Sequence, residues 1–147
     1  MSIFSSLNIS GSALTAQRLR MDVTANNIAN AETTRTASGG PYRREEVVFT
    51  PIEAPRVSTV FSRGRPTDLS EGGVRVSAIV EDEAPPRMVY EPGHPDADAE
   101  GYVAYPDIDV VTEMTDMISA TRAYEANVSA INAAKSMATK ALEIARG

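Results

Sequence analysis

Cysteine and tryptophan are absent from this 147-residue chain, and His94 is its only histidine. The absence of cysteine excludes disulfide scaffolds, cysteine-ligated zinc and thiol catalysis. A single histidine without cysteine can form neither a zinc site nor a Cys–His pair. The chain also lacks a G-x-S-x-G element and a P-loop lysine pattern. We therefore expect a protein that is not an enzyme, with no catalytic residue, no cofactor and no metal.

Long apolar runs are missing as well. No stretch approaches eighteen apolar residues, so the sequence predicts no transmembrane segment. The first twenty residues lack a basic region followed by an unbroken apolar stretch, and we expect no cleaved signal peptide. With 14 basic and 20 acidic side chains the net charge is -6, which argues against binding to nucleic acid.

Proline is confined to the middle of the chain. All nine prolines lie between Pro41 and Pro106. Because proline breaks helix interiors, only the two ends are free to form long helices. We therefore divide the chain into an N-terminal axial helix with its bend (1–38), a proline-rich β and loop segment (39–106) and a C-terminal axial helix (107–147).

The N-terminal segment carries a heptad repeat. One row of apolar residues recurs at every seventh position: Leu7, Leu14, Met21 and Ile28. Such a narrow strip suits packing against another helix rather than a broad core. The helix should end near Asn30, before a stretch with β-branched residues, two glycines and a proline.

The C-terminal segment repeats the pattern over five heptads. One predicted row contains Val110, Met117, Tyr124, Ile131 and Ala138, and the other contains Met114, Thr121, Val128, Lys135 and Leu142. Pro106 followed by Asp107 or Asp109 is a suitable start, because acidic groups stabilise the positive end of a helix. A helix of about 36 residues would be roughly 54 Å long.

The middle segment predicts β-structure. Apolar runs and alternation indicate strands over 45–53 and 73–82, with shorter ones over 87–91 and 101–105. The flanking prolines restrict these strands to short or edge positions. The expected fold class is α+β: long terminal helices pair as a coiled-coil core, and a small loop-rich β segment is inserted between them.

The helices should be marginally stable alone. Their rows offer about ten sizeable apolar side chains, whereas ordering each helical residue costs about 1–2 kcal/mol of backbone entropy. We therefore expect neighbouring molecules to supply further burial, so that the ends order on assembly.

An acidic stretch from Asp96 to Asp107 partly matches a calcium loop. Asp96, Asp98 and Glu100 would take the first three ligand positions, and Gly101 the invariant turn. However, Asp107 is short for a bidentate ligand, and no helix can enter through the preceding prolines. We expect a solvated acidic turn, in which His94 is a turn residue.

The most informative short element closes the first helix. Asn27 and Asn30 lie on one helical face beside Ile28, and Thr33 follows. Amides both donate and accept hydrogen bonds, so they can satisfy freed carbonyls at a helix end and fix the register against a partner. On composition alone, an ordinary polar helix end is an equal alternative.

Three strings together resemble the axial proteins of the bacterial flagellum, in particular the proximal rod proteins of its basal body. They are NIANAET (27–33), TTRTASGGPYRRE (33–45) and VYEPGHPDADAEGYVAYPDIDVVTEMTDMISATRAYEANVSAINAAKSM (89–137). The resemblance covers about the first 45 and the last 60 residues. It implies that the paired terminal helices line a hollow, torque-transmitting rod, with the middle segment packed outside.

The resemblance also implies partners and a location. Subunits would leave the cell through the flagellar type III export apparatus and assemble in the periplasmic space. There they would contact copies of themselves, other rod proteins and the adaptor that joins the rod to the inner-membrane ring. The implied assembly interface comprises Leu7, Leu14, Met21, Ile28, Met114, Met117, Tyr124, Val128, Ile131 and Leu142. Asn27, Asn30 and Thr33 would set the bend out of the helix.

Two other functions are compatible with parts of the sequence. A soluble coiled-coil adaptor or secretion chaperone would use the same apolar rows without polymerising, and would form a stable dimer at low concentration. A wall-cleaving hydrolase would need paired carboxylates, for which the Asp96–Glu100 region is the candidate. A proline-rimmed turn gives those carboxylates no pocket and no reason for a raised pKa, so we favour the rod subunit.

Overall fold

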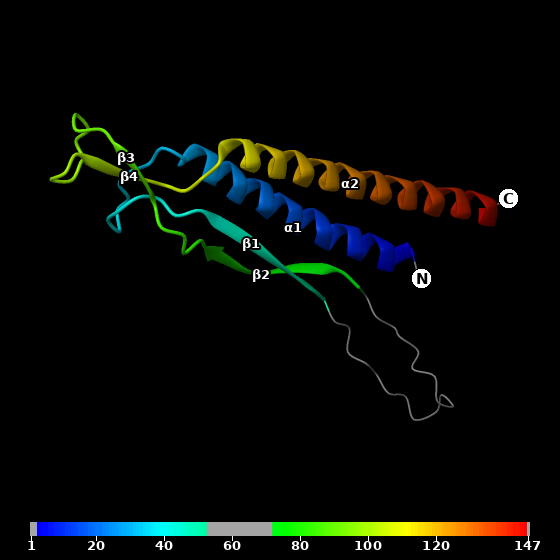
Figure 1. The fold of residues 1–147 in the computed structure, drawn as a ribbon. Coiled ribbons are helices and arrows are strands. Elements are labelled where there is room, and N and C mark those ends of the chain that lie inside the picture. Colours follow the sequence, from blue (N-terminus) through cyan, green and yellow to red (C-terminus); the bar gives the residue numbers. More distant parts are fainter. Residues whose placement is uncertain (1–2, 53–71, 147) are drawn as a thin grey trace, which may run out of the picture.

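The two ends of the chain form long helices, and the middle forms four short strands. The computed structural model describes residues 3–52 and 72–146. Its elements are α1 (Ile3–Ala29), β1 (Glu45–Pro51), β2 (Val74–Glu81), β3 (Arg87–Tyr90), β4 (Tyr102–Tyr105) and α2 (Val110–Arg146). The helices lie side by side and run in opposite directions (Figure 1). The predicted α+β class with terminal helices is confirmed.

Helix α1 is the central layer of the described structure. It packs against α2 on one side and against both β1 and β2 on the other (Figure 1). On the strand side, the Ser12 hydroxyl accepts a hydrogen bond from the Val74 amide at 3.2 Å. Ala16 and Val23, seven residues apart on α1, are buried. The small core of the subunit therefore lies along α1.

Strands β1 and β2 form an antiparallel pair beside α1. Val47 pairs with Ile79 and Phe49 with Val76, and the register shifts between Val48 and Phe49. Val47 and Phe49 are half-buried, whereas Val48 between them is exposed, as the two-residue period of a strand requires. The predicted strand over 45–53 ends at Pro51, and Glu53 lies outside the described residues.

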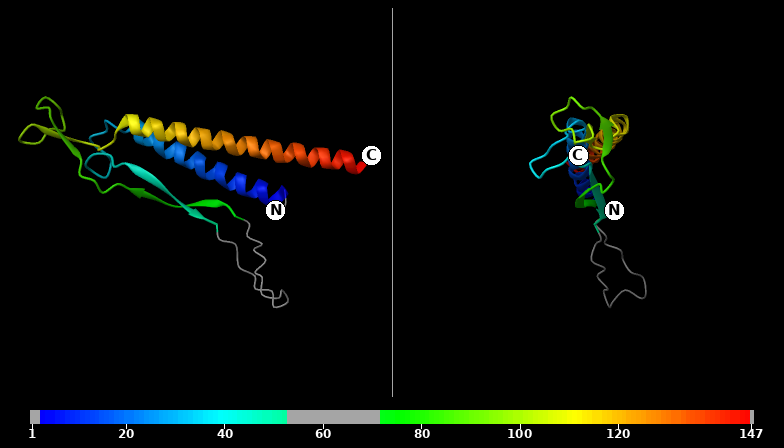
Figure 2. Two further views of the ribbon diagram at one scale, coloured as in Figure 1. Left: turned by 45° about the vertical axis from the view of Figure 1, so that its right-hand side comes forward. Right: turned by 60° about the vertical axis from the view of Figure 1, so that its left-hand side comes forward.

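Strands β3 and β4 form a second antiparallel pair, beyond the end of the helices (Figure 2). Val103 is completely buried, and the Tyr90 and Tyr102 rings meet edge to face with centroids 5.3 Å apart. Gly101 precedes β4 with φ of +86°, in the left-handed region that favours glycine. The short strands predicted over 87–91 and 101–105 are present within one residue at each end.

The inward face of α2 differs from one of the two predicted rows. Glu113, Ala120 and Ala134 are buried and Asn127 is half-buried, again at seven-residue spacing. Met114 and Leu142, from the predicted second row, are 53% and 66% exposed. Within the subunit that row is therefore wrong by one position. Small side chains let the helices approach closely, whereas the sequence pattern favoured the larger apolar neighbours.

The other rows lie where the repeat predicts, except that Val110, the first residue of the α2 row, is exposed. On α2, the half-buried residues are Met117, Tyr124, Ile131 and Ala138, and Val128 on the flank is also half-buried. On α1, the half-buried residues are Leu7, Leu14, Met21 and Ile28. The Met21 sulfur accepts a hydrogen bond from the Thr121 hydroxyl at 3.5 Å. These side chains leave part of their apolar surface uncovered.

The helices differ in length. Helix α1 has 27 residues and α2 has 37, so α2 is about 55 Å long, close to the predicted length. The end of α1 lies beside the start of α2, and the last turns of α2 extend beyond the start of α1 (Figure 1). In the described part of the chain, neither helix combines the length and hydropathy needed to cross a membrane.

Asp109 caps the start of α2. Its carboxylate accepts hydrogen bonds from the Val111 amide at 3.1 Å and from the Thr112 hydroxyl at 2.6 Å. These bonds favour the ionised form, so the pKa of Asp109 is lowered from its ordinary value, with the Thr112 bond as the larger cause. Of the two predicted starting residues, Asp109 is the one that makes the cap.

Candidate functional site

A buried polar cluster lies where α1 ends and α2 begins. It consists of Asn27 on α1, Arg44 just before β1 and Glu113 on α2, with Tyr42 and Asp116 at its edge; we name it the junction cluster. Asn27 is 1% exposed and Glu113 is 2% exposed. Polar groups buried to this degree require hydrogen-bond partners.

Asn27 uses its full hydrogen-bonding capacity. Its amide nitrogen donates to the Glu45 carbonyl at 2.8 Å and to Glu113 Oε2 at 3.0 Å. Its amide oxygen accepts from the Glu45 backbone amide at 3.0 Å and from the Tyr42 hydroxyl at 3.1 Å. Two donors and two acceptors are all that an asparagine side chain offers. One side chain therefore joins α1, β1 and α2.

Glu113 and Arg44 form the charged part of the cluster. Arg44 Nε donates to Glu113 Oε1 at 2.6 Å, and another guanidinium nitrogen lies 3.9 Å from Asp116. Burial alone would lower the pKa of Arg44, but the hydrogen bond and negative charge of Glu113 raise it further than burial lowers it. Arg44 therefore stays charged and neutralises the buried carboxylate.

Tyr42 sits at the edge of this charge pair. Burial raises the pKa of its hydroxyl, and the negative charges of Glu45 and Glu113 raise it further. The hydroxyl therefore stays protonated at neutral pH and can donate to Asn27.

The chain leaves α1 through a bonded bend. The Asn30 amide donates to the Asn26 carbonyl at 2.9 Å, and its oxygen accepts from the Thr33 hydroxyl at 3.1 Å. The Thr33 carbonyl then accepts from the Tyr42 backbone amide at 3.0 Å. These bonds lie where the chain turns from α1 back towards β1.

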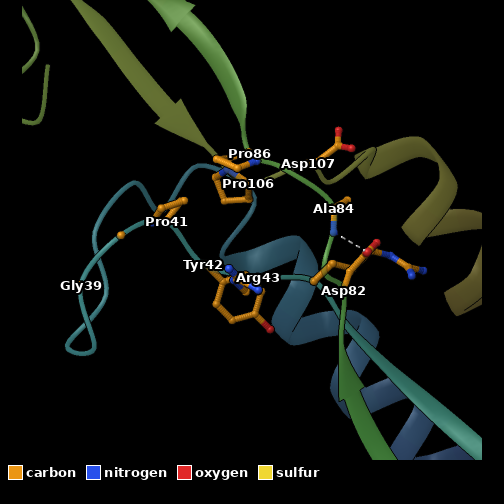
Figure 3. Close-up of a pocket in the computed structure, with 11 residues that line it drawn as sticks. Gly39, Pro41, Tyr42, Arg43, Asp82, Ala84, Pro86, Pro106 and Asp107 are labelled. Carbon is orange, nitrogen blue, oxygen red and sulfur yellow. Dashed lines mark hydrogen bonds between the residues drawn. The ribbon is translucent and has the colours of Figure 1, made fainter. Parts of the chain in front are cut away.

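A shallow cavity of about 150 Å³ adjoins the bend (Figure 3). Its wall combines the loop at 39–44 with Asp82, Ala84, Pro86, Pro106 and Asp107. The Asp82 carboxylate accepts a hydrogen bond from the Ala84 amide at 2.9 Å, drawn as a dashed line in Figure 3. The wall is thus a mixture of prolines and glycines with a few charged side chains, Asp82 and Asp107 among them.

The acidic stretch near β4 forms a turn whose side chains bond within the chain. Asp98 Oδ1 accepts from the amides of Glu100 and Tyr102, and Asp96 accepts from the Thr34 hydroxyl. His94 Nδ1 accepts from the Asp96 amide at 3.1 Å. Over residues 3–52 and 72–146, no three His, Asp or Glu side chains come together in a way that could hold a metal ion.

Apolar side chains are exposed near both ends of α2. Near its start these are Val111, Met114 and Ile118, and near its end they are Met137, Leu142 and Ile144, of which Ile144 is 82% exposed. The last turns of α2 extend beyond α1 (Figure 1). Exposed apolar surface of this kind is typical of sites of protein–protein contact.

Sequence reasoning identified Asn27, Asn30 and Thr33 but missed Tyr42, Arg44 and Glu113. Tyr42 and Arg44 lie in the proline-rich segment, and no periodic sequence pattern indicates that this segment contacts a helix. Glu113 did carry a signal, because it stands seven residues before the buried Ala120. An acidic residue at that spacing indicates a buried charge that needs a basic partner.

Two protein-family models match the ends of the chain. Residues 7–35 match "Flagella basal body rod protein", and residues 99–144 match "Flagellar basal body rod FlgEFG protein C-terminal". Three relatives are each described as "Flagellar basal-body rod protein FlgC". The one from Borreliella burgdorferi is 49% identical, with all of both chains covered. The Bacillus subtilis protein is 47% identical over 99% of this chain and all of its own, and the Salmonella typhimurium protein is 43% identical over 98% of both.

Proposed function

The chain belongs to the FlgC family of flagellar basal-body rod proteins, and from this membership we propose how it assembles, where it does so and with which partners. As a member of this family it is a structural subunit of the flagellar basal-body rod, and it assembles with other rod components. The position of its contacts within the rod is the proposed part.

The terminal helices form the assembly interface. On α1 the contact residues are Leu7, Leu14, Met21 and Ile28, and on α2 they are Met114, Met117, Tyr124, Val128, Ile131 and Leu142. The observation that carries this proposal is the uncovered apolar surface of α2, including Met114 and Leu142. Neighbouring rod subunits, copies of this chain among them, would bury that surface and stabilise the helix pair.

The bend keeps the helices and strands in fixed relation during assembly. Asn30 and Thr33 bond to each other, and Asn27 bonds to Glu45 at the start of β1. We assign these three residues to setting the angle at which the chain leaves α1. Strands β1 and β2 pack against α1 and not against α2, so they leave α2 open to the proposed neighbours (Figure 1).

The proximal rod is the proposed position of this subunit, in the periplasmic space. Export through the flagellar type III apparatus without a cleaved signal peptide would deliver it there, and the adaptor at the inner-membrane ring would be a neighbour. The protein's role is mechanical rather than catalytic. Support for that role comes from relatives described as rod proteins and from carboxylates that bond within their own turn.

The test is complementation of a strain that lacks its own copy of the gene. We expect Leu142→Asp and Val128→Asp to be exported normally but to prevent rod assembly, because a carboxylate cannot be buried at an apolar contact without a partner. Thr139→Asp, at an exposed polar position of α2 that is not among the proposed contact residues, is the matched control and should support swimming. Normal swimming with Leu142→Asp and Val128→Asp would contradict the proposed interface.

A further inference from the structure

The apolar rows of the helix pair do not by themselves define its register. Inward-facing positions recur every seven residues on both helices, so a shift of seven residues brings equivalent positions together again. Helix α2 is ten residues longer than α1, so α1 could move seven residues towards the α2 C-terminus without losing overlap. Moving the other way would carry Asn27 past the start of α2. The lengths of the helices therefore allow one alternative register.

Polar side chains distinguish the two registers. In the observed register, Asn27 bonds to Glu113 at 3.0 Å and Arg20 bonds to Asp116 at 3.1 Å. A seven-residue shift would place Asn27 opposite Ala120 and Arg20 opposite Ala123. Both polar groups on α1 would lose their partners on α2. Asn27 is buried, so leaving its amide without this acceptor carries a desolvation penalty, whereas the partly exposed Arg20 would lose only a weaker, solvent-screened bond.

Arg44 extends this discrimination to the middle segment. Arg44 stands one residue before β1 and bonds to Glu113 at 2.6 Å. Asn27 bonds to Glu45 on β1 itself. A shifted α2 would leave Arg44 and Asn27 in place but move Glu113 about 10 Å along the helix axis. The ion pair between Arg44 and Glu113 and the hydrogen bond between Asn27 and Glu113 would then both be broken.

We propose that Asn27, Arg44 and Glu113 select the register of α1 against α2, while the apolar rows supply attraction without selecting it. Buried polar residues fix the register of other paired helices in the same manner, at some expense of stability. Selection of this kind determines which turns of α2 extend beyond α1. The proposal concerns the single subunit and stands independently of its role in the rod.

The absence of native cysteine allows a direct test in the full-length purified chain. Met21→Cys with Thr121→Cys reports the observed register, since the Met21 sulfur and Thr121 hydroxyl are in contact. Met21→Cys with Val128→Cys reports the shifted register. Each pair is treated with a short thiol-specific crosslinker, and the yields are compared. In the parent chain the first pair should dominate.

The decisive background is Asn27→Leu combined with Glu113→Leu. We expect helix content by circular dichroism to be retained and the ratio of shifted to observed crosslinks to rise roughly tenfold. Glu113→Gln keeps the shape of the side chain but has a single acceptor oxygen, so it can accept from Asn27 or from Arg44 but not from both, and the ratio should rise less than in the double-leucine background. Glu125→Gln, an exposed acid elsewhere on α2, is the control for charge and should change nothing.

Two results would overturn the proposal. An unchanged crosslink ratio in the double-leucine background would mean that the chain connections, rather than the polar residues, set the register. Loss of helix content in that background would mean that the junction cluster holds the helices together instead of choosing between two packed arrangements.

Discussion

Arg44 Nε lies 2.6 Å from Glu113 Oε1, although 69 residues separate them in the chain. This pair connects the segment before β1 to the first turns of α2. The carboxylate is buried, whereas the guanidinium is partly exposed and also lies near Glu46 and Asp116. Replacing Glu113 therefore removes a buried charge, whereas replacing Arg44 removes a partly exposed one.

Glu113→Ala should lower the free energy of unfolding by roughly 2–3 kcal/mol, somewhat less than the loss of a partner from a fully buried pair. Arg44 would lose its main partner, and the Asn27 amide would lose one acceptor. Urea unfolding of the purified chain, followed by circular dichroism at 222 nm, measures the change. Glu125→Ala, an exposed acid on the same helix, should change the free energy by less than about 0.5 kcal/mol. Equal losses in the two variants would contradict a structural role for the charge pair.

Ala120→Leu should lower the thermal stability of the helix pair. Ala120 is completely buried on the inward face of α2, and added methylene groups in a packed interface typically cost about 1–3 kcal/mol. Ala126→Leu adds the same atoms on the exposed face and is the matched control. Thermal unfolding should show a lower midpoint for Ala120→Leu alone. If both variants unfold at the parent temperature, the helices do not pack closely at this position.

Gly101→Ala should destabilise the β3–β4 pair. A Cβ at this position would lie 2.9 Å from a Tyr90 ring carbon, and the backbone φ of +86° is unfavourable for alanine. Gly93→Ala meets nothing within 4 Å and has no positive φ, so it is the control. Amide hydrogen exchange over residues 87–105 should rise in the Gly101 variant and stay unchanged in the Gly93 variant. Equal protection in both would show that the close contact at Gly101 can relax.

Because the ionised Asp109 carboxylate caps α2, we expect the protein to lose stability in acid. The pKa of Asp109 is lower in the folded chain than in the unfolded chain, so its contribution is complete above the unfolded value of about 4. The contribution is lost as the pH falls through the folded value. Asp109→Asn can still cap the helix but does not titrate, so its urea midpoint should fall less between about pH 6 and about pH 3. Glu125→Gln controls for the loss of one negative charge. An equal fall in parent and Asp109→Asn would contradict the cap.

Much of the fold could be predicted from local patterns. Confinement of proline to the middle segment indicated two terminal helices, and alternation gave the strands within two residues of their observed ends. The inward face of α2 could not be predicted fully, because its buried positions carry glutamate and alanine rather than large apolar residues. Pairing of Arg44 with Glu113 could not be predicted either, since it depends on how the middle segment folds back on α1.

The unequal length of the helices gives the subunit a direction. The end of α1 lies beside the start of α2, and at the other end of the pair α2 continues alone (Figure 1). In a shaft made of such subunits, we expect the projecting turns of α2 to overlap the neighbouring molecule. Overlapping subunits would carry a twisting load as shear along their shared length, whereas subunits that met only end to end would separate at a single plane.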